Sequence, residues 1–485
     1  MEDLQSPPPS ALQLSPEEMR ALGYRVVDRI VAHVAGVRDQ AVSGGAPRAE
    51  MERRLREPPP EEGRGWEAAL ERTMADVFGP MSHVDHPRFF AYVPSPGSFV
   101  GAMADALVSG LNPFAGAWAT AAGAAEVELV AADWLRGLCG LPEGAGGAFV
   151  SGGSMANLTA LAVARWRRFG AEDFSRAVVY CSDQAHSSIH RAARVLGFRP
   201  EQVRVLPADG AYRLPVEELE RAAEADRAAG LVPFLAVGSA GTTNTGAVDP
   251  LPALAEACRR LGTWMHVDGA YGAPAVLTER GRELLRGIER ADSVSLDPHK
   301  WLFQPFECAC ILVRDGGALR DAFRMVPEYL KDSDRAEEEV NFRDWGVQLT
   351  RSFRALKLWL SVQVHGLAAF RAAVARGMRL AGVGGGDPGA ARHRHLPPRG
   401  RGDEGGRGAR RAAAPHRYRD GAGRVGDAEH HGAGRPRGAA PVHHQPAHHG
   451  RRRARDGAPP GAHRPGAGGA SVSADLSRTR AAPHH

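Results

Sequence analysis

Short apolar segments alternate with helix-like segments between residues 148 and 313, and this alternation restricts the possible folds more than any other feature. Strands that are connected through helices run parallel, and the helices cover both faces of their sheet. We therefore predict an α/β fold with a mostly parallel sheet. The predicted strands are Ala148–Val150, Ala177–Cys181, Val203–Leu206, Phe234–Val237, Trp264–Val267, Ser293–Leu296 and Ala309–Val313. The predicted helices between them are Met155–Arg167, Ser187–Leu196, Pro215–Ala229 and Pro250–Leu261.

The part of the chain before this sheet is predicted to be mainly helical. Ser15-Pro16-Glu17-Glu18 has the pattern of a capping box, and apolar residues then recur at spacings of three and four as far as Val37. We interpret this first helix as a packing helix, for example against a second subunit. The remaining predicted elements are a Pro/Gly/Arg-rich connector from Val42 to Gly65, helices at Trp66–Phe78, Ala124–Leu138 and His365–Leu380, and a strand-like run at Pro87–Pro94.

The N-terminus, the apolar runs and the cysteines indicate the cellular compartment of the protein. The N-terminus has no basic region before an apolar run, which argues against a signal peptide. No run of about 18 apolar residues occurs, so no membrane span is predicted. The cysteines are scattered and never spaced as a CxxC pair, so we predict reduced thiols in a cytoplasmic protein, and no metal site. They are Cys139, Cys181, Cys258, Cys308 and Cys310.

The composition changes abruptly at residue 381. Residues 381–485 contain 19 arginines, no lysines and 8 acidic residues, a surplus of 11 positive charges. Because the whole chain carries +5, residues 1–380 carry −6, and this acidic body gives no electrostatic reason to expect nucleic acid. Only seven residues of the last segment are Ile, Leu, Val, Met, Phe, Tyr or Trp, too few to form a core.

We therefore predict three regions: an N-terminal helical segment with its connector at 1–85, a large domain at 86–380, and a low-complexity, disordered tail at 381–485. The change occurs within one helix and without a linker, which favours a shifted reading frame as the origin of the tail. A genuine basic tail that binds RNA or other surfaces is the alternative interpretation.

Small and polar residues follow five of the predicted strands, at the sheet edge where ligands of such folds bind. Ser151-Gly152-Gly153-Ser154 follows the first strand and begins a helix, so its backbone N–H groups and the Ser154 hydroxyl could hold a phosphate. An ordinary tight turn has the same pattern. His186 follows the second strand and could stack on a flat ring, or could be a core or capping histidine.

Three further strand ends carry candidate groups. The hydroxyl-rich loop Ser239–Gly246 suits contact with a planar ligand, but equally an ordinary loop. Asp268 ends the strand that contains His266, and a buried acid needs a cationic partner unless it caps a helix. Lys300, one of only three lysines, follows Ser293–Leu296 and stands beside His299. A desolvated lysine beside other cations can form a Schiff base, whereas most loop lysines are simply solvated.

Together these groups match the requirements of pyridoxal 5′-phosphate. This cofactor needs an amine for its aldehyde, a cradle for its phosphate, an acid for its pyridine nitrogen and a flat group against its ring. The same segments resemble the group II pyridoxal-phosphate-dependent amino-acid decarboxylases, and within them most of all the aromatic-L-amino-acid decarboxylases. The resemblance covers roughly residues 15 to 380. It is carried by Pro87–Tyr92, Ser151–Asn157, Ser182–Ser188, Gly241–Thr243, His266–Tyr271 and Ser295–Trp301.

The resemblance implies a fold-type-I enzyme and a role for each matching residue. Lys300 would hold the cofactor as a Schiff base, Asp268 would keep the pyridine nitrogen protonated, and His186 would stack on the ring. The remaining cofactor contacts would come from Ser95, Gly152, Gly153, Ser154, Thr243, Ala270, Asp297 and His299. Asp297 departs from the asparagine that is usual in the animal enzymes, and near a phosphate it would need a proton or a cationic neighbour.

The resemblance also implies a reaction: loss of CO₂ from an L-amino acid, with aromatic substrates favoured, and return of a proton to Cα. Tyr329 matches a tyrosine that supplies this proton, with His299 as a second proton carrier. A homodimer is implied, and so is a small C-terminal domain, which we expect to be missing from the chain as written. The alternatives are an aldehyde-forming decarboxylase, a decarboxylase of acidic amino acids such as glutamate, or a non-catalytic remnant.

Overall fold

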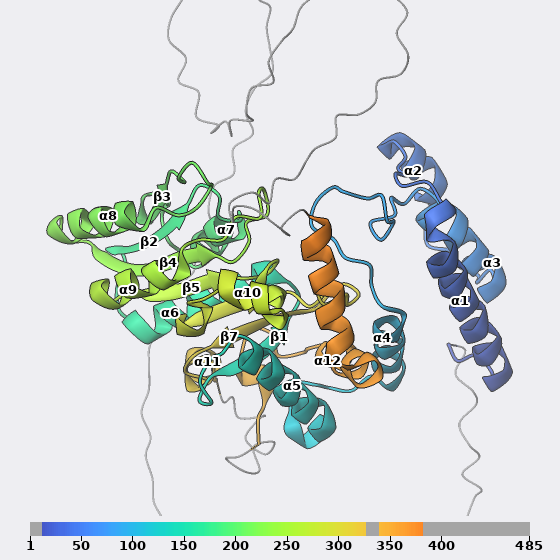
Figure 1. Cartoon of the computed structure of the whole chain (residues 1–485). Helices are drawn as coiled ribbons and strands as arrows, with labels where there is room; N and C mark the ends of the chain where they lie inside the picture. The colour runs from blue at the N-terminus through green and yellow to red at the C-terminus, as the bar shows by residue number, and fades with distance from the viewer. Residues whose placement is uncertain (1–11, 326–338, 382–485) are drawn as a thin grey trace, which may run out of the picture. The chain divides into compact units, whose positions relative to one another are not determined.

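The computed structural model describes residues 12–325 and 339–381, all within one unit of the chain. Its centre is a seven-stranded sheet with the strand order β1-β7-β6-β5-β4-β2-β3 (Figure 1). Every predicted strand is confirmed, with ends shifted by at most two residues. The strands are β1 Gly146–Val150, β2 Ala177–Ser182, β3 Val203–Leu206, β4 Val232–Ser239, β5 Trp264–Asp268, β6 Ser293–Leu296 and β7 Ala309–Val313.

The sheet is mostly parallel, as predicted. Strands β2 to β6 pair in parallel, whereas β7 runs antiparallel to both of its neighbours, β1 and β6. Because β1 and β6 are both antiparallel to β7, they run in the same direction as each other. The carboxyl ends of β1, β2, β4, β5 and β6 therefore lie at one edge of the sheet. This places the segments after these strands, with all the candidate residues they carry, at that edge.

Helices cover both faces of the sheet because side chains alternate along each strand. In β7, Cys310 and Leu312 join the core cluster that includes α5, α8, α9 and α12, whereas Ala309 and Ile311 join the cluster of α6 and α11. The helices are α1 Pro16–Gly36, α2 Arg48–Leu55, α3 Trp66–Arg72, α4 Phe99–Leu111, α5 Trp118–Leu138, α6 Gly153–Phe169, α7 Ser188–Val195, α8 Val216–Ala228, α9 Leu251–Leu261, α10 Glu279–Leu284, α11 Gly317–Phe323 and α12 Ala355–Leu380. Shorter helical turns are η1 Val37–Asp39, η2 Thr73–Phe78, η3 Pro200–Gln202, η4 Ala273–Leu277, η5 Ile288–Arg290 and η7 Phe342–Asp344.

A buried ion pair joins α5 to the segment before α12. Both guanidinium ends of Arg351 bind Glu128, at 2.6 and 3.0 Å, and Arg351 also donates to the backbone oxygen of Phe149 in β1. Glu128 in turn accepts a hydrogen bond from the Phe149 backbone N–H at 2.8 Å. Because both charges are buried and paired, each depends on the other for compensation.

The N-terminal expectations are confirmed in part. Ser15 caps α1 through the predicted capping box with Glu18. The Val42–Gly65 connector contains helix α2, which the Pro, Gly and Arg content concealed, and the predicted helix over 66–78 changes to a wider π-helical turn after Arg72. The strand predicted at Pro87–Pro94 is wrong, since this segment pairs with no strand and leaves the side chains of Phe90 and Tyr92 exposed.

Helix α12 reaches the length and mean hydropathy of a membrane-crossing helix, the one such helix among the described residues. It bends at Gly366, where φ is 72° and ψ is 152°, and it packs against α4 and α5. Phe370 and Val374 are buried in the core cluster of one sheet face. A bent helix with these contacts is typical of core packing, and its apolar composition needs no membrane to explain it.

Candidate active site

A cavity of about 280 Å³ opens at the carboxyl edge of the sheet. Its walls are formed by the segments that follow β1, β2, β4, β5 and β6, and its volume lies near the lower end of small-molecule sites, roughly 300–1,000 Å³. The lining residues are Ser151, Gly152, Gly153, Ser154, Met155, Asn157, His186, Ser239, Gly241, Thr242, Thr243, Asp268, Ala270, Tyr271, Asp297, His299, Lys300 and Glu307.

Lys300 and Asp297 form an ion pair in this cavity. The Lys300 Nζ lies 2.9 Å from Asp297 Oδ2, and His299 Nε2 lies 3.5 Å from the same oxygen. Burial raises the pKa of Asp297, while the Lys300 ammonium and His299 act in the opposite direction. The cationic neighbour that an aspartate requires at this position is therefore Lys300 itself.

His299 is oriented by the backbone of the next strand. Its Nδ1 accepts a hydrogen bond from the N–H of Cys308 at 3.1 Å. Burial lowers the pKa of this histidine, opposed by the nearby Asp297 carboxylate. The neutral ring must therefore carry its proton on Nε2, the nitrogen that faces Asp297.

The turn Ser151–Ser154 leaves space beside the helix that follows it. Gly153 has to be a glycine, because a Cβ there would lie 2.8 Å from the Ala270 Cβ and 2.9 Å from Asp297 Oδ2. A Cβ on Gly152 would meet only His299 Cε1, at 3.8 Å, so this position stays open toward the cavity. The first N–H groups of α6, a helix of 17 residues, have no partner within the helix and suit an anion.

Asp268 ends β5 and is held by hydrogen bonds on both of its oxygens. Asn157, on α6, donates its side-chain amide to Asp268 Oδ2 at 2.8 Å, and the Ser295 hydroxyl donates to Oδ1 at 3.2 Å. The Ala270 N–H also approaches Oδ1 at 3.2 Å. Three donors therefore hold this carboxylate in place as a hydrogen-bond acceptor.

The direction of every hydrogen bond behind Asp268 follows from its charge. An ionised carboxylate only accepts, so the Asn157 atom beside it is the NH₂ group, and the amide oxygen must face His266 Nε2 at 3.0 Å. Burial lowers the pKa of His266 to about 4, so the ring is neutral at pH 7 with its proton on Nε2. Its Nδ1 then accepts from Ser293, whose oxygen accepts from the Trp264 indole N–H.

The same amide also orients His186. The second hydrogen of Asn157 Nδ2 is donated to the Ser188 hydroxyl at 2.8 Å, and Ser188 lies 2.8 Å from His186 Nδ1. Because the Ser188 oxygen accepts from Asn157, its own proton is free to be donated to His186, and the Ser188 backbone N–H approaches the same nitrogen at 3.3 Å. His186 Nδ1 is therefore the accepting nitrogen of this ring, and Nε2 is the nitrogen left to donate. Asn157 thus connects two of the predicted site residues.

Most of the predicted site residues line this one cavity. The sequence-predicted residues found there are Gly152, Gly153, Ser154, His186, Thr243, Asp268, Ala270, Asp297, His299 and Lys300. Ser95 is buried but does not line the cavity, and its hydroxyl has no hydrogen-bond partner among the described residues. Tyr329 lies outside the described residues.

Several lining residues were given no role from the sequence. Asn157 and Met155 stand in the quoted segment after β1, and Gly241 and Thr242 in the hydroxyl-rich loop, so their segments were found without their contacts. The signal that could have identified Asn157 is an amide on the apolar face of an otherwise buried helix. Glu307 gave no sequence signal, because only the fold brings it back to this edge.

The residues present fit pyridoxal 5′-phosphate. The cavity combines an open glycine turn at a helix N-terminus, a carboxylate held by three donors, a lysine and a histidine ring, which are the groups that this cofactor requires. Asp297 Oδ1 is a buried acceptor without a partner among the described residues, at the side of the glycine turn. It marks the place where a hydrogen-bond donor is still needed.

Comparison with known proteins agrees with this fit. Residues 48–385 match the family model described as the pyridoxal-dependent decarboxylase conserved domain. The chain is 48% identical to the aromatic-L-amino-acid decarboxylase of Bacillus atrophaeus over 371 residues, which is 76% of this chain and 77% of the relative. It is 35% identical to the phenylacetaldehyde synthase of Petunia hybrida over 370 residues, covering 74% and 73% of the two chains.

A solved structure supports the same assignment. The structure of Oryza sativa TDC with PLP and tryptamine superposes with a TM-score of 0.72 and 32% identity, and the match covers 76% of this chain and 79% of that one. Family model, relatives and fold agree over most of the chain. The protein belongs to the pyridoxal-dependent decarboxylase family and is an amino-acid decarboxylase that uses pyridoxal 5′-phosphate.

Proposed function

We propose that this decarboxylase acts on an aromatic L-amino acid and releases the corresponding amine. The observation that carries the proposal is the charge of the cavity wall. Lys300 is the only lysine or arginine among the described lining residues, and Glu307 adds a carboxylate. The nearby Arg354 is already bound to Glu307, at 2.8 and 3.1 Å. The side-chain carboxylate of an acidic substrate would therefore meet repulsion and no free cation, whereas an aromatic ring would meet neither.

The relatives support the same choice. The bacterial relative is named as an aromatic-L-amino-acid decarboxylase, and the rice structure contains tryptamine, an aromatic amine. The alternative outcome is an aldehyde, because the Petunia relative is named as a phenylacetaldehyde synthase at lower identity. Amine formation is the main proposal because the relative with the higher identity carries the decarboxylase name.

Each site residue has a proposed part in this reaction. When bound, the cofactor supplies an aldehyde that captures amines and a protonated ring that accepts the electron pair left when CO₂ departs. Lys300 would carry the cofactor on its amine, and Gly152, Gly153 and Ser154 would hold the phosphate with their N–H groups. Asp268 would hold a proton on the pyridine nitrogen. His186 and Ala270 would lie against the two ring faces, with Thr243 and Ser95 beside the cofactor and substrate.

Proton handling falls to three groups in this proposal. Asp268 is held by hydrogen bonds from Asn157 and Ser295. Its carboxylate would accept a hydrogen bond from the protonated pyridine nitrogen and so keep that proton in place. His299 presents its Nε2 proton toward Asp297 and the cavity. Tyr329, outside the described residues, is proposed to return a proton to the substrate Cα.

Product identification tests the substrate and the product together. The purified protein, supplied with pyridoxal 5′-phosphate, is incubated in air with tyrosine, tryptophan, phenylalanine, glutamate, aspartate and cysteine sulfinate, and products are identified by mass spectrometry. Amines from the aromatic substrates only are expected. Turnover of glutamate or aspartate in preference would refute the aromatic proposal, and aldehyde with ammonia would establish the synthase alternative. Bound cofactor without any turnover would indicate a non-catalytic remnant.

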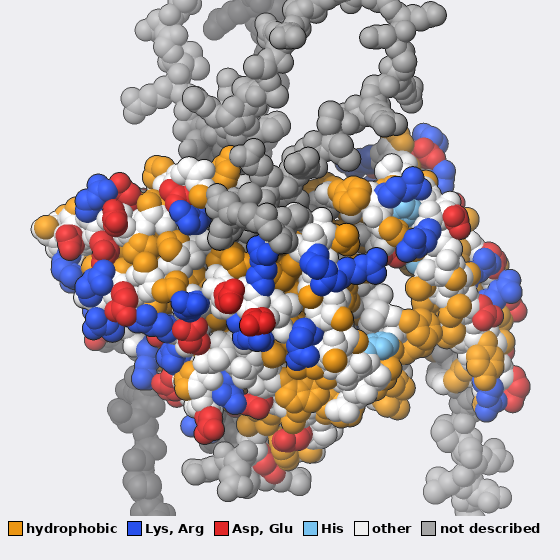
Figure 2. All heavy atoms as spheres, viewed as in Figure 1, with side chains coloured by type: hydrophobic (Ala, Val, Ile, Leu, Met, Phe, Trp, Pro, Cys, Tyr) orange, Lys and Arg blue, Asp and Glu red, His pale blue; other side chains and the backbone are white. Residues whose placement is uncertain are grey.

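We propose a homodimer built in part on the N-terminal helices. Exposed apolar side chains gather on α1 and α4, among them Tyr24, Val34, Leu107 and Leu111, with exposures of 70%, 49%, 51% and 78%. On the visible face, apolar side chains lie in patches, while basic and acidic ones are interspersed (Figure 2). Apolar patches of this kind are typical of interfaces.

We propose a cytoplasmic location as well. All five cysteines are free and buried, which supports a reducing compartment.

We propose further that residues 381–485 arise from a shifted reading frame. They lie outside the described residues except for Ala381, and the family match ends at residue 385, next to the change in composition. Translation of the other frames beyond codon 380 should then give a stretch with strand and helix periodicity. The chain as written should express poorly and show little or no decarboxylase activity. Full activity, with slow amide exchange throughout 381–485, would identify the tail as genuine structure.

A further inference from the structure

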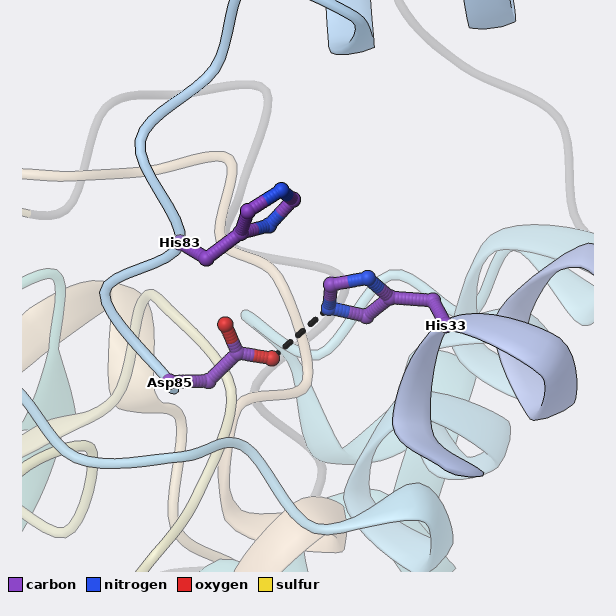
Figure 3. A group of neighbouring side chains, drawn as sticks. All are labelled: His33, His83 and Asp85. Atoms are coloured by element: carbon purple, nitrogen blue, oxygen red, sulfur yellow. Dashed lines mark hydrogen bonds and ion pairs between the residues drawn. The ribbon is translucent and has the colours of Figure 1, made fainter. Parts of the chain in front are cut away.

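Two histidines and an aspartate, none of which lines the cavity, meet at the end of α1. His33 lies in the last turn of α1, and His83 and Asp85 lie in the segment between η2 and α4 (Figure 3). His33 Nε2 is 2.7 Å from Asp85 Oδ2, and one ligand atom of each of the three residues lies within 4.8 Å of the others. We propose that these residues bind a divalent transition-metal ion, with zinc favoured by the donor set.

The geometry is close to that of a metal site. A tetrahedral zinc ion with Zn–N bonds of about 2.0–2.1 Å holds its ligand atoms roughly 3.4 Å apart, and two bound imidazoles then have centroids about 5 Å apart. The ring centroids of His33 and His83 are 5.2 Å apart. Rotations that move the side-chain ends by about 1 Å would bring all three ligand atoms around one ion. Two imidazoles with one carboxylate favour zinc or its transition-metal neighbours over Mg²⁺ or Ca²⁺.

An ion pair alone accounts for only two of the three residues. His33 and Asp85 satisfy each other, but His83 Nδ1 is buried and has no hydrogen-bond partner among the described residues. A buried ring nitrogen without a partner is unfavourable, because it has lost its hydrogen bond to water and gained none in return. Figure 3 shows the His83 ring beside the His33–Asp85 pair, with one ring nitrogen turned toward it. A metal ion between the three side chains would give this nitrogen its missing partner.

The backbone around the site is fixed independently of the three side chains. The His83 N–H donates to the Val42 oxygen at 3.1 Å, and Ser82 exchanges hydrogen bonds with the backbone of Gly44 at 3.1 and 3.2 Å. A Cβ on Gly44 would lie 2.2 Å from the Met81 oxygen, so these two segments are in direct contact. His33 also stands at a helix C-terminus, whose partial negative charge favours a bound cation.

The ion would fasten α1 to the segment that leads to Ser95 and α4. Its three protein ligands leave a fourth position for water. We assign the ion the role of holding the two segments together, independent of the decarboxylation, because none of its ligands lines the cofactor cavity. The prediction of no metal site is not tested by this cluster of side chains, and its ligands left no sequence motif because His33 and His83 are about 50 residues apart.

Amide exchange localises the effect of zinc, which matters because residues 381–485 contain 12 histidines of their own. The full chain with its cofactor is freed of metal by chelation, and exchange of peptides covering 26–36 and 80–88 is measured with and without Zn²⁺. At a zinc concentration ten times the dissociation constant, exchange of both peptides should slow by about tenfold. Mg²⁺ at the same concentration should have no effect.

His83→Ala separates the metal site from a plain ion pair, because it leaves His33 and Asp85 in place. The zinc effect should disappear in His83→Ala and remain in His365→Ala, a control that removes an exposed histidine of α12. Asp85→Asn, which keeps the side-chain shape, should shift the zinc titration upward by about tenfold or more. An equal zinc effect in the wild type and His83→Ala, or none in either, would overturn the proposal.

Discussion

The side-chain amide of Asn157 donates a hydrogen bond of 2.8 Å to the carboxylate of Asp268. The first residue belongs to the helix after β1 and the second to the end of β5, so the bond joins two cavity-lining residues 111 positions apart in sequence. Through it the charge of Asp268 fixes the proton positions on His266 and His186. This makes Asn157 a positioning residue in our proposal.

Replacing Asn157 by Leu should lower kcat by about 10- to 100-fold, since a hydrogen bond to a charged group is worth about 1.5–3 kcal/mol. Loss of this donor leaves Asp268 Oδ2 without the group that orients it toward the pyridine nitrogen, so the pyridine proton is held less firmly. The absorbance of the bound cofactor, titrated with pH, should shift its midpoint. Thr159→Val, also buried on α6, is the control. An unchanged midpoint in Asn157→Leu would leave the residue a purely structural role.

Asp268→Asn should bind the cofactor and still lose most of its turnover. An amide carries no negative charge, so it cannot hold the ring proton that makes the cofactor an electron acceptor. Cofactor content by absorbance and kcat by amine release are the two measurements. A near-native rate would show that another group supplies the proton.

Lys300→Ala should lose the covalently attached cofactor. The wild type should absorb at roughly 420 nm, as expected of the cofactor joined to an amine, and the variant should not. Borohydride reduction followed by peptide mapping should label Lys300 in the wild type. Label on Lys331 or Lys357 would contradict the assignment.

Glu128→Gln should destabilise the fold by about 3–5 kcal/mol, because it leaves the Arg351 charge buried without its partner. Glu52→Gln, which breaks the exposed 2.8 Å pair with Arg48, should cost less than about 1 kcal/mol. Urea midpoints of the two variants give the comparison. Similar midpoints would mean that the buried pair is not required for stability.

Stability should fall as the pH drops from about 6.5 toward 4. The buried His266 has its pKa lowered to about 4, whereas the same ring in the unfolded chain titrates near its ordinary value of 6.5. Between these values the unfolded state binds more protons, so its population grows with acid. Urea midpoints at pH 7 and pH 5 measure the loss. The loss should be smaller in His266→Gln, and an equal loss would exclude His266 as its source.

The sequence predicted the sheet well because its strands are short apolar runs between amphipathic helices. The reversed direction of β7 was not predicted, since a run such as Ala309–Val313 is buried on both faces in either direction. The prediction of a strand at Pro87–Pro94 was wrong. Strand-forming residues make a strand only where a neighbouring strand supplies hydrogen bonds, and this segment lies beside no strand among the described residues.

The site residues could be predicted where they follow strands, because one sheet edge collects them whatever the details of packing. Asn157 was missed because its importance depends on which helix face turns toward Asp268. Glu307 and the cluster of His33, His83 and Asp85 were missed because their neighbours come from distant parts of the chain. Contacts of this kind follow from tertiary structure and leave no local pattern.

The place of β7 between β1 and β6 has a consequence during synthesis. Among the described strands β1 pairs with β7 alone, and Ala309 of β7 comes 159 positions after Val150 of β1. At ribosomal speeds of about 5–20 residues per second, β1 waits roughly 8–30 s for its partner. During that interval the nascent chain exposes an unpaired apolar strand, the species on which chaperones act. The glycine turn after β1 therefore reaches its final position only after Lys300 has been translated.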